Sequence, residues 1–139
     1  MSMSNSRASL SLRSVLLLDA ATCVGMGGAL VLASRPLGTA TELPIALLFW
    51  AGLSLFPVAA LMAFVATRPV ISSTGAWLLI GGNLAWIAAS ALLLVSGWAK
   101  PNALGTAFVV GQALAVALLS WLEYVALRGD GRALQPAGR

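Results

Sequence analysis

Two acidic residues, Asp19 and Glu123, stand in stretches of the sequence that are otherwise almost entirely apolar. An ionised and unpaired carboxylate inside a hydrocarbon layer is costly, so each of these residues needs either a partner or a function. A carboxylate can bind a cation or a proton, and the amide side chains of Asn83 and Gln112 can hold the polar groups of a ligand. Asp19, Asn83, Gln112 and Glu123 are therefore the candidate ligand-binding or proton-binding residues.

The rest of the composition limits the chemistry open to these carboxyl groups. The chain has no histidine and one cysteine, Cys23, which excludes a Cys/His metal cluster, a histidine-held haem and an internal disulfide. Histidine proton relays and Ser-His or Cys-His nucleophilic sites are excluded as well. We expect no metal and no cofactor, and we interpret Cys23 as a small apolar core residue.

An enzyme is the least favoured functional class for this sequence. Asp19 and Glu123 could form an acid pair inside the membrane, but no nucleophile, metal ligand or phosphate-binding loop accompanies them. The sequence therefore predicts a protein that is not an enzyme.

The elements that must position the polar residues are transmembrane helices. Of the 139 residues, 60% are hydrophobic and 9% are charged, and the mean hydropathy is +0.95, far more apolar surface than a soluble domain of this size could bury. Roughly 20 apolar residues cross a hydrocarbon core of about 30 Å. We predict an all-α, polytopic membrane protein, a four-transmembrane-helix bundle. Its spans are about residues 15–33, 44–66, 75–95 and 103–127, within a domain of residues 15–128.

The segments outside these spans are short. Residues 1–14 are Ser-rich, which predicts a cytoplasmic arm without a fold of its own, and residues 129–139 are expected to form a cytoplasmic tail. Turn-forming residues predict an irregular connection over residues 34–43. Pro57, near the middle of the second span, is interpreted as a packing kink, with a gating hinge as the alternative. No connection is long enough to form a soluble domain.

The distribution of basic residues predicts the orientation. Six fall on one side of the four-span arrangement: Arg7, Arg13, Arg68, Arg128, Arg132 and Arg139. Only Arg35 and Lys100 fall on the other side, so the positive-inside rule places both termini in the cytoplasm, N-in and C-in. We expect a multi-pass protein of the cell inner (cytoplasmic) membrane, whose net charge of +4 reflects topology and not a nucleic acid partner.

Depth and helical phase favour a common location for the polar residues. Asp19, Asn83 and Glu123 lie in the cytoplasmic halves of three different spans, and Gln112 and Glu123 share one helix face to within about 20°. Two stripes at helical spacing could face inward. They are Asn83, Trp86 and Ser90 on the third span and Asp19, Cys23, Met26 and Leu30 on the first.

These stripes allow two interpretations. In the first, they form a polar pocket open toward the cytoplasm, in which Asp19 or Glu123 binds a cation or a proton. In the second, Arg13 or Arg128 pairs with a carboxylate near the membrane surface, and Asn83 and Gln112 only hydrogen-bond between helices.

Small residues indicate where helices could approach closely. Ala21, Gly25 and Ala29 form a ridge of small residues on the first span, and Gly81 and Gly82 offer close approach on the third. Such ridges can pack within one chain or between copies.

Several short segments in the first, third and fourth spans resemble those of a known group. They are Leu17-Leu18-Asp19-Ala20, Asn83-Leu84-Ala85-Trp86, Ser96-Gly97-Trp98, Gly105 with Phe108 and Gln112, and Glu123-Tyr124. In these the chain resembles a family of small four-span integral membrane proteins predicted from bacterial genomes and uncharacterised. The resemblance implies a four-span membrane protein and no activity.

Two functional hypotheses follow. The leading one is a non-enzymatic inner-membrane protein that acts as an accessory or interaction subunit, because the chain is nearly all membrane and lacks catalytic groups. The alternative is a small proton-coupled transporter, or a membrane ligand-binding protein, that uses Asp19 and Glu123. The expected partners are the lipid bilayer and a larger membrane complex or a homo-oligomer.

Overall fold

The structure is a computed structural model that describes the backbone of residues 11–133 and the side chains of residues 11–130. It contains five helices and no strand over this range: α1 (Leu12–Leu32), α2 (Ser34–Thr41), α3 (Ile45–Ala66), α4 (Ser73–Val95) and α5 (Ala103–Ala133). All except α2 are long and apolar enough to cross a membrane. The prediction of an all-α, multi-pass membrane protein is confirmed.

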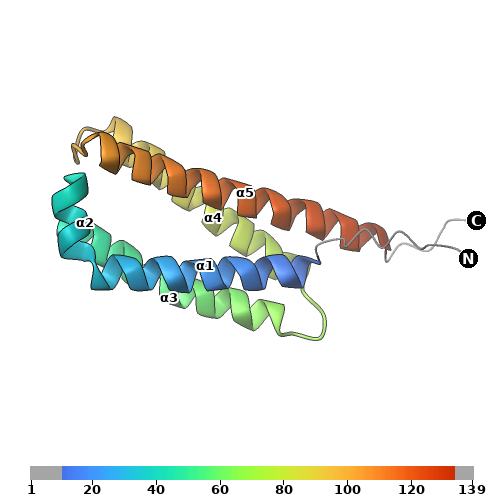
Figure 1. Ribbon diagram of the computed structural model, residues 1–139. Helices are drawn as coiled ribbons and strands as arrows, with labels where there is room; N and C mark the ends of the chain where they lie inside the picture. The colour runs from blue at the N-terminus through green and yellow to red at the C-terminus, as the bar shows by residue number, and fades with distance from the viewer. Residues whose placement is uncertain (1–10, 134–139) are drawn as a thin grey trace, which may run out of the picture.

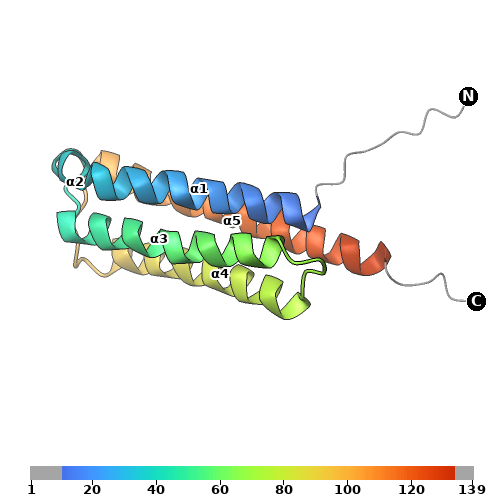
Figure 2. The same ribbon diagram turned by 90° about the horizontal axis from the view of Figure 1, so that it is seen from below.

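The four long helices lie alongside one another (Figures 1 and 2). The start of α1, the end of α5 and the α3–α4 connection share one end of the molecule, which we call the terminal end. The short helix α2 and the α4–α5 connection share the opposite end, which we call the loop end. An even number of passes therefore returns the chain to the side on which α1 begins.

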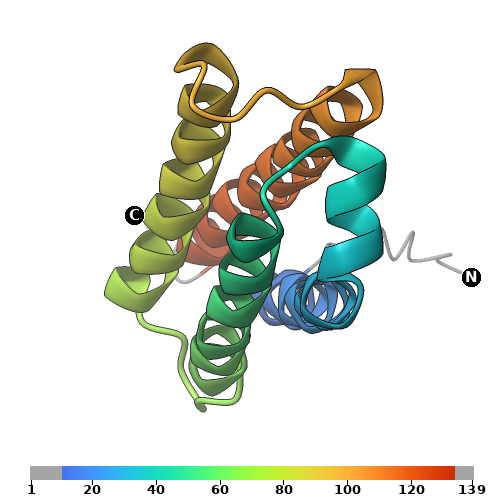
Figure 3. The ribbon, with the colours of Figure 1, turned by 90° about the vertical axis from the view of Figure 1, so that its left-hand side faces the viewer.

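The helices pack as two pairs, and one seam between the pairs is loose. Helix α1 packs along α3, and α4 packs along α5, while α1 also meets α5. Although α3 and α4 are consecutive, they make few contacts with each other (Figure 3). We call the line between these two helices the α3–α4 seam.

Two apolar cores fill the interior, one towards each end. The terminal-end core joins all four long helices and includes Leu16, Met62, Ala76 and Ala126, all buried. The loop-end core includes Leu30, Leu43, Leu48 and Val109. The candidate polar residues lie between these cores, so the site is enclosed by apolar packing along the helix axes.

The connection between the first two spans differs from the prediction. Residues 34–41 form helix α2, where the sequence analysis expected an irregular segment. Pro36 is compatible with this helix because it lies in the first turn, whose N–H groups have no intrahelical acceptor. The helix ends at Glu42, which adopts a left-handed conformation with φ 57°.

The ends of α1 and α5 also extend beyond the predicted spans. Helix α1 begins at Leu12, with the Ser11 side chain accepting a hydrogen bond from the Ser14 N–H, so the expected arm is helical from that point. Helix α5 continues past Gly129, the expected start of the tail, to Ala133. The remainder of the expected arm and tail, residues 1–10 and 134–139, lies outside the described residues.

Helices α1 and α3 approach closely at glycines other than the predicted ridge. A Cβ atom added to Gly27 would lie 2.9 Å from the Gly52 carbonyl oxygen, whereas one added to Gly25 would meet nothing within 4 Å. Gly81 and Gly82 on α4 are equally open. The small residues predicted as packing ridges therefore do not mediate close approach within the described chain.

Candidate functional site

Three of the four candidate residues are in direct contact. The side-chain nitrogen Nδ2 of Asn83 on α4 donates to Asp19 Oδ2 on α1 at 3.2 Å and to Glu123 Oε2 on α5, also at 3.2 Å. Their exposed fractions are 3% for Asp19, 7% for Asn83 and 0% for Glu123. We call these residues the polar trio. Their contact reflects the similar depth that the sequence analysis assigned to them on three different helices.

The trio has more acceptors than donors. An amide nitrogen carries two N–H groups, and both carboxyl groups use this one nitrogen. Cys23 Sγ lies 3.8 Å from Asp19 Oδ1, a contact that can supply only a weak S–H donor. Glu123 Oε1 is buried and has no hydrogen-bond partner in the structure. A proton or a cation would supply the missing interaction.

Neither acid forms an ion pair within the described residues. The arginines that the sequence analysis considered as partners point elsewhere. Arg13 donates to the Arg68 carbonyl oxygen at 2.8 Å, and the Arg128 guanidinium lies 5.4 Å from the centre of the Tyr124 ring. The described residues also contain no group of three or more His, Cys, Asp or Glu side chains that could hold a metal ion.

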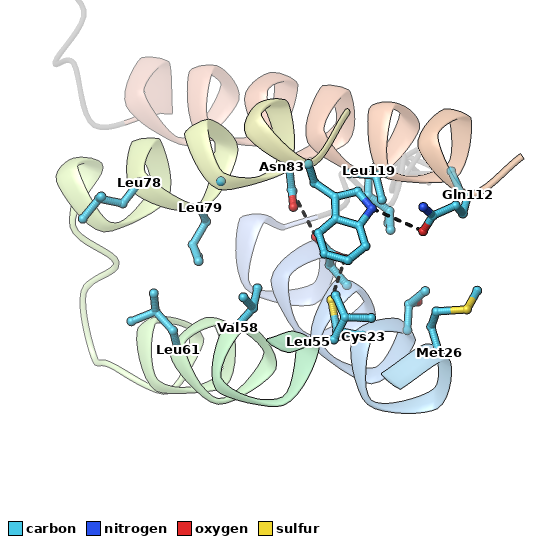
Figure 4. Close-up of a pocket in the computed structure, with 16 residues that line it drawn as sticks. Cys23, Met26, Leu55, Val58, Leu61, Leu78, Leu79, Asn83, Gln112 and Leu119 are labelled. Atoms are coloured by element: carbon cyan, nitrogen blue, oxygen red, sulfur yellow. Dashed lines mark hydrogen bonds between the residues drawn. The ribbon is translucent and has the colours of Figure 1, made fainter. Parts of the chain in front are cut away.

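A cavity of about 190 Å³ lies beside the trio and is lined by all four long helices (Figure 4). Asp19 and Asn83 contribute polar atoms, and most of the remaining wall is apolar. Leu55, Val58 and Leu61 of α3 face Leu78 and Leu79 of α4 across it. Glu123 lies behind Asn83 and Asp19 and does not line the cavity.

One exposed edge of the cavity lies at the α3–α4 seam. Val58, Leu61 and Leu78 line it and are exposed beside this seam. Thr22 on α1 and Ala115 on α5 also line it and are exposed, on the side of the α1–α5 contact. The prediction that the pocket opens toward the cytoplasm stays a prediction, and a route along the helix axes would have to pass the terminal-end core. In this core, each long helix places a buried apolar residue one or two turns beyond the trio.

Gln112, the fourth candidate residue, forms no hydrogen bond with the trio in the part of the chain that the structure describes. Its Oε1 accepts a hydrogen bond of 3.2 Å from Trp86 Nε1, which links α5 to α4 on the loop-end side of the trio. Gln112 and Trp86 line both the first cavity and a second one of about 200 Å³ beside the loop-end core. This pair therefore separates two cavities along the same interior.

The sequence analysis assigned no ligand-binding role to two residues of the site. Cys23 was interpreted as a core residue, and it contacts Asp19. Trp86 had no assigned ligand role, and it forms a wall of both cavities. Both belong to the inward stripes, so helical spacing in the sequence could have identified them as residues of the site. Asp19, Cys23 and Met26 line the first cavity, and Leu30 lines the second.

No family model matches the chain, and comparisons with curated proteins and with solved structures likewise give no match.

Proposed function

We propose that the protein is a small proton-coupled transporter of the cell inner membrane, in which the polar trio holds the coupling proton. The observation that supports this proposal is the sharing of the Asn83 nitrogen by two buried carboxyl groups. Two ionised carboxylates that both lie 3.2 Å from one nitrogen repel each other and have too few hydrogen-bond donors. One proton held by the pair relieves the repulsion and provides the donor that they lack, as in other carboxyl pairs that share a proton.

The cavity connects this proton to a solute. Asp19 belongs both to the trio and to the cavity wall, so a positive charge entering the cavity changes the cost of ionising the carboxyl pair. Such coupling is reciprocal, because a solute that releases the proton is itself released when the proton returns. A buried acid serving only to hold helices together would not need a cavity beside it.

The proposed topology places the terminal end in the cytoplasm. The excess of arginine at that end supports this orientation. The trio would then lie in the cytoplasmic half of a four-helix bundle. We propose a transporter and not an enzyme, acting alone or as a homo-oligomer in the bilayer, without a nucleic acid partner.

Infrared difference spectroscopy on the protein in lipid nanodiscs tests the proton site. We expect a protonated carboxylic acid band at neutral pH that is lost in both Asp19→Asn and Glu123→Gln. Glu42→Gln is the matched control, because Glu42 is an exposed acid in the loop-end connection. A spectrum without any protonated carboxyl band at neutral pH, or one unchanged in both trio variants, would rule out the proposed proton site.

An accessory or interaction subunit is the second candidate function. The α3–α4 seam supports it, since two consecutive helices with few mutual contacts leave room for the helix of a partner. Native mass spectrometry of the protein extracted gently from its own membrane separates the two candidates. A stoichiometric heterocomplex would favour the accessory role, whereas a monomer or a homo-oligomer would favour the transporter.

A further inference from the structure

We propose that the cavity beside the polar trio binds a lipophilic monocation, a quaternary or protonated amine with an apolar group, which enters from the bilayer through the α3–α4 seam. This inference rests on the proposed function and names the class of its solute.

The charge of the cavity favours a cation. The Asn83 amide nitrogen is engaged by both carboxyl groups, so the acid that remains to face a ligand is Asp19. Behind it, Glu123 Oε1 is buried without a partner and adds a further unsatisfied acceptor. A site with surplus acceptors and no cationic side chain of the described residues attracts a positive charge and repels an anion.

The walls of the cavity favour an apolar body on that cation. Leucine and valine side chains from α3 and α4 form two facing sides of the cavity that Asp19 also lines. Trp86 forms the wall towards the loop end, and an aromatic ring attracts a cation within about 6 Å of its centre. A hydrated inorganic ion would have to lose its water against these apolar walls, whereas an organic cation would gain contact with them.

The exposed edge of the cavity at the α3–α4 seam, which we call the mouth, favours entry from the bilayer. Val58, Leu61 and Leu78 expose apolar side chains at the α3–α4 seam, where lipid chains surround the protein. An axial route from the nearer membrane surface would have to pass the terminal-end core. Gly82 lines the cavity, is exposed, and has no atom within 4 Å of the place where a Cβ would stand. A larger side chain at this position would fill the mouth.

The titratable groups around the cavity define the proton balance. Helix α1 contributes Asp19 and Cys23, and α5 contributes Glu123, while α4 contributes the neutral Asn83. The lining residues of α3 are all apolar. When a monocation binds beside Asp19, the carboxyl pair gives up its proton to the solution, so the charge of the site does not change. Acidic pH should therefore weaken cation binding, because protons compete for the same pair.

The test uses benzyltrimethylammonium as the cation and neopentylbenzene as its neutral isostere. Each is added to the protein in weakly buffered lipid nanodiscs, while binding is followed by calorimetry and proton release by a pH-sensitive dye. We expect saturable binding of the cation, with proton release that saturates at the same concentration. The neutral isostere should release no proton, and Asp19→Asn should abolish cation binding and proton release together.

Two glycine variants test the route and do not alter the polar groups. Gly82→Leu should slow the association of the cation by about tenfold, which corresponds to ~1.4 kcal/mol in the activation barrier. Gly81→Leu is the matched control, since Gly81 is the neighbouring exposed glycine, is equally open and does not line the cavity. It should bind the cation as fast as the wild type. Equal association rates in the two leucine variants would overturn entry through the seam.

The remaining outcomes separate this inference from the proposed proton site. If the infrared band reports a protonated pair but the cation binds no better than its neutral isostere, the inference fails and the proton site stands. If the cation binds through Asp19 without releasing a proton, the cation site stands and the proposed coupling fails. Unchanged cation binding by a folded Asp19→Asn variant would overturn the inference.

Discussion

The side chains of Asn83 and Glu123, which are separated by forty positions in the sequence, meet at 3.2 Å between Asn83 Nδ2 and Glu123 Oε2. The same nitrogen also reaches Asp19, so a single amide links α4 to both α1 and α5. Glu123 is fully buried at this point, and Asn83 is the donor that the structure gives it. The polar trio therefore has a structural role as well as the proposed proton-binding one, and the two roles can be separated by mutation.

The first prediction concerns the structural role of Asn83. Asn83→Leu has a similar size but leaves both carboxyl groups without their amide donor, which should lower the free energy of unfolding by about 1–3 kcal/mol. Ser90→Ala is the control, because the Ser90 hydroxyl is also buried on α4 but donates to the Trp86 carbonyl oxygen of its own helix. Its cost should stay below about 1 kcal/mol. Unfolding by SDS in mixed micelles measures both, and equal losses would contradict the linking role of Asn83.

The second prediction concerns the hydrogen bond between Trp86 and Gln112. Trp86→Phe removes the indole N–H, and Gln112→Leu removes the acceptor. If the bond stabilises the contact between α4 and α5, the double variant should lose less than the sum of the single variants. The difference should be about 0.6 kcal/mol, the average for interhelical hydrogen bonds in membranes. Additive losses in the same SDS unfolding assay would show that the bond contributes nothing to stability.

Part of the candidate site could be predicted from the sequence, because the position of a residue within a transmembrane helix determines its depth in the membrane. The spans limit where Asp19, Asn83 and Glu123 can lie along the membrane normal. Three polar residues at one depth are expected to pair, because an unpaired polar side chain in the hydrocarbon layer is costly. Helical phase then identified the inward stripes that carry Cys23 and Trp86. The exposed edge of the cavity at the α3–α4 seam could not be predicted in this way, because it depends on which helices are neighbours and how tightly they pack.

The partner of Gln112 shows the same limit. It lies on the same face of α5 as Glu123, but three turns of helix separate the two residues. At its own depth the available partner is the indole of Trp86, which donates to it. Helix α2 was missed for a different reason. Its proline and glycine indicate a turn in isolation, whereas the packing of α2 against α3 and α5 stabilises a short helix there.

The third prediction concerns Asn102, whose side chain links two helices at the loop end. Its side chain donates to the Ala40 carbonyl oxygen at 2.8 Å and accepts from the Gly105 N–H at 2.9 Å, so it connects α2 to the first turn of α5. Asn102→Ala removes both bonds and should cost about 1–2 kcal/mol. Asn102→Ser keeps an acceptor for the helix N–H and should cost less.

Hydrogen exchange measured by mass spectrometry provides the readout for Asn102. Amides of α2 should exchange faster in Asn102→Ala than in the wild type, because the helix loses the side-chain bond to Ala40 and keeps the bond from the Asn102 N–H to the Thr41 carbonyl oxygen. Ser96→Ala is the control in the same connection, since the Ser96 hydroxyl bonds only within its own segment. Faster exchange of α2 in the control, or none in Asn102→Ala, would contradict the role assigned to Asn102.

The fourth prediction concerns the contact between α1 and α3. A Cβ added to Gly52 would lie 2.6 Å from Leu30 Cβ and 2.9 Å from the Gly27 carbonyl oxygen, and one added to Gly27 would meet the Gly52 carbonyl oxygen at 2.9 Å. Backbone atoms cannot move aside as a flexible side chain can, so either substitution forces the helices apart. Gly27→Ala and Gly52→Ala should each lower the free energy of unfolding by about 1–3 kcal/mol.

Gly25→Ala and Gly28→Ala are the matched controls on α1, because a Cβ at either position would meet nothing within 4 Å. Alanine is the better helix former by about 1 kcal/mol, so these variants should be neutral or more stable than the wild type. The double variant Gly27→Ala/Gly52→Ala should lose less stability than the sum of its single variants, because the helices need to separate only once. Losses of similar size at all four glycines would instead indicate a general sensitivity of α1 and α3 to substitution, and the close approach of Gly27 and Gly52 would then not be what holds these helices together.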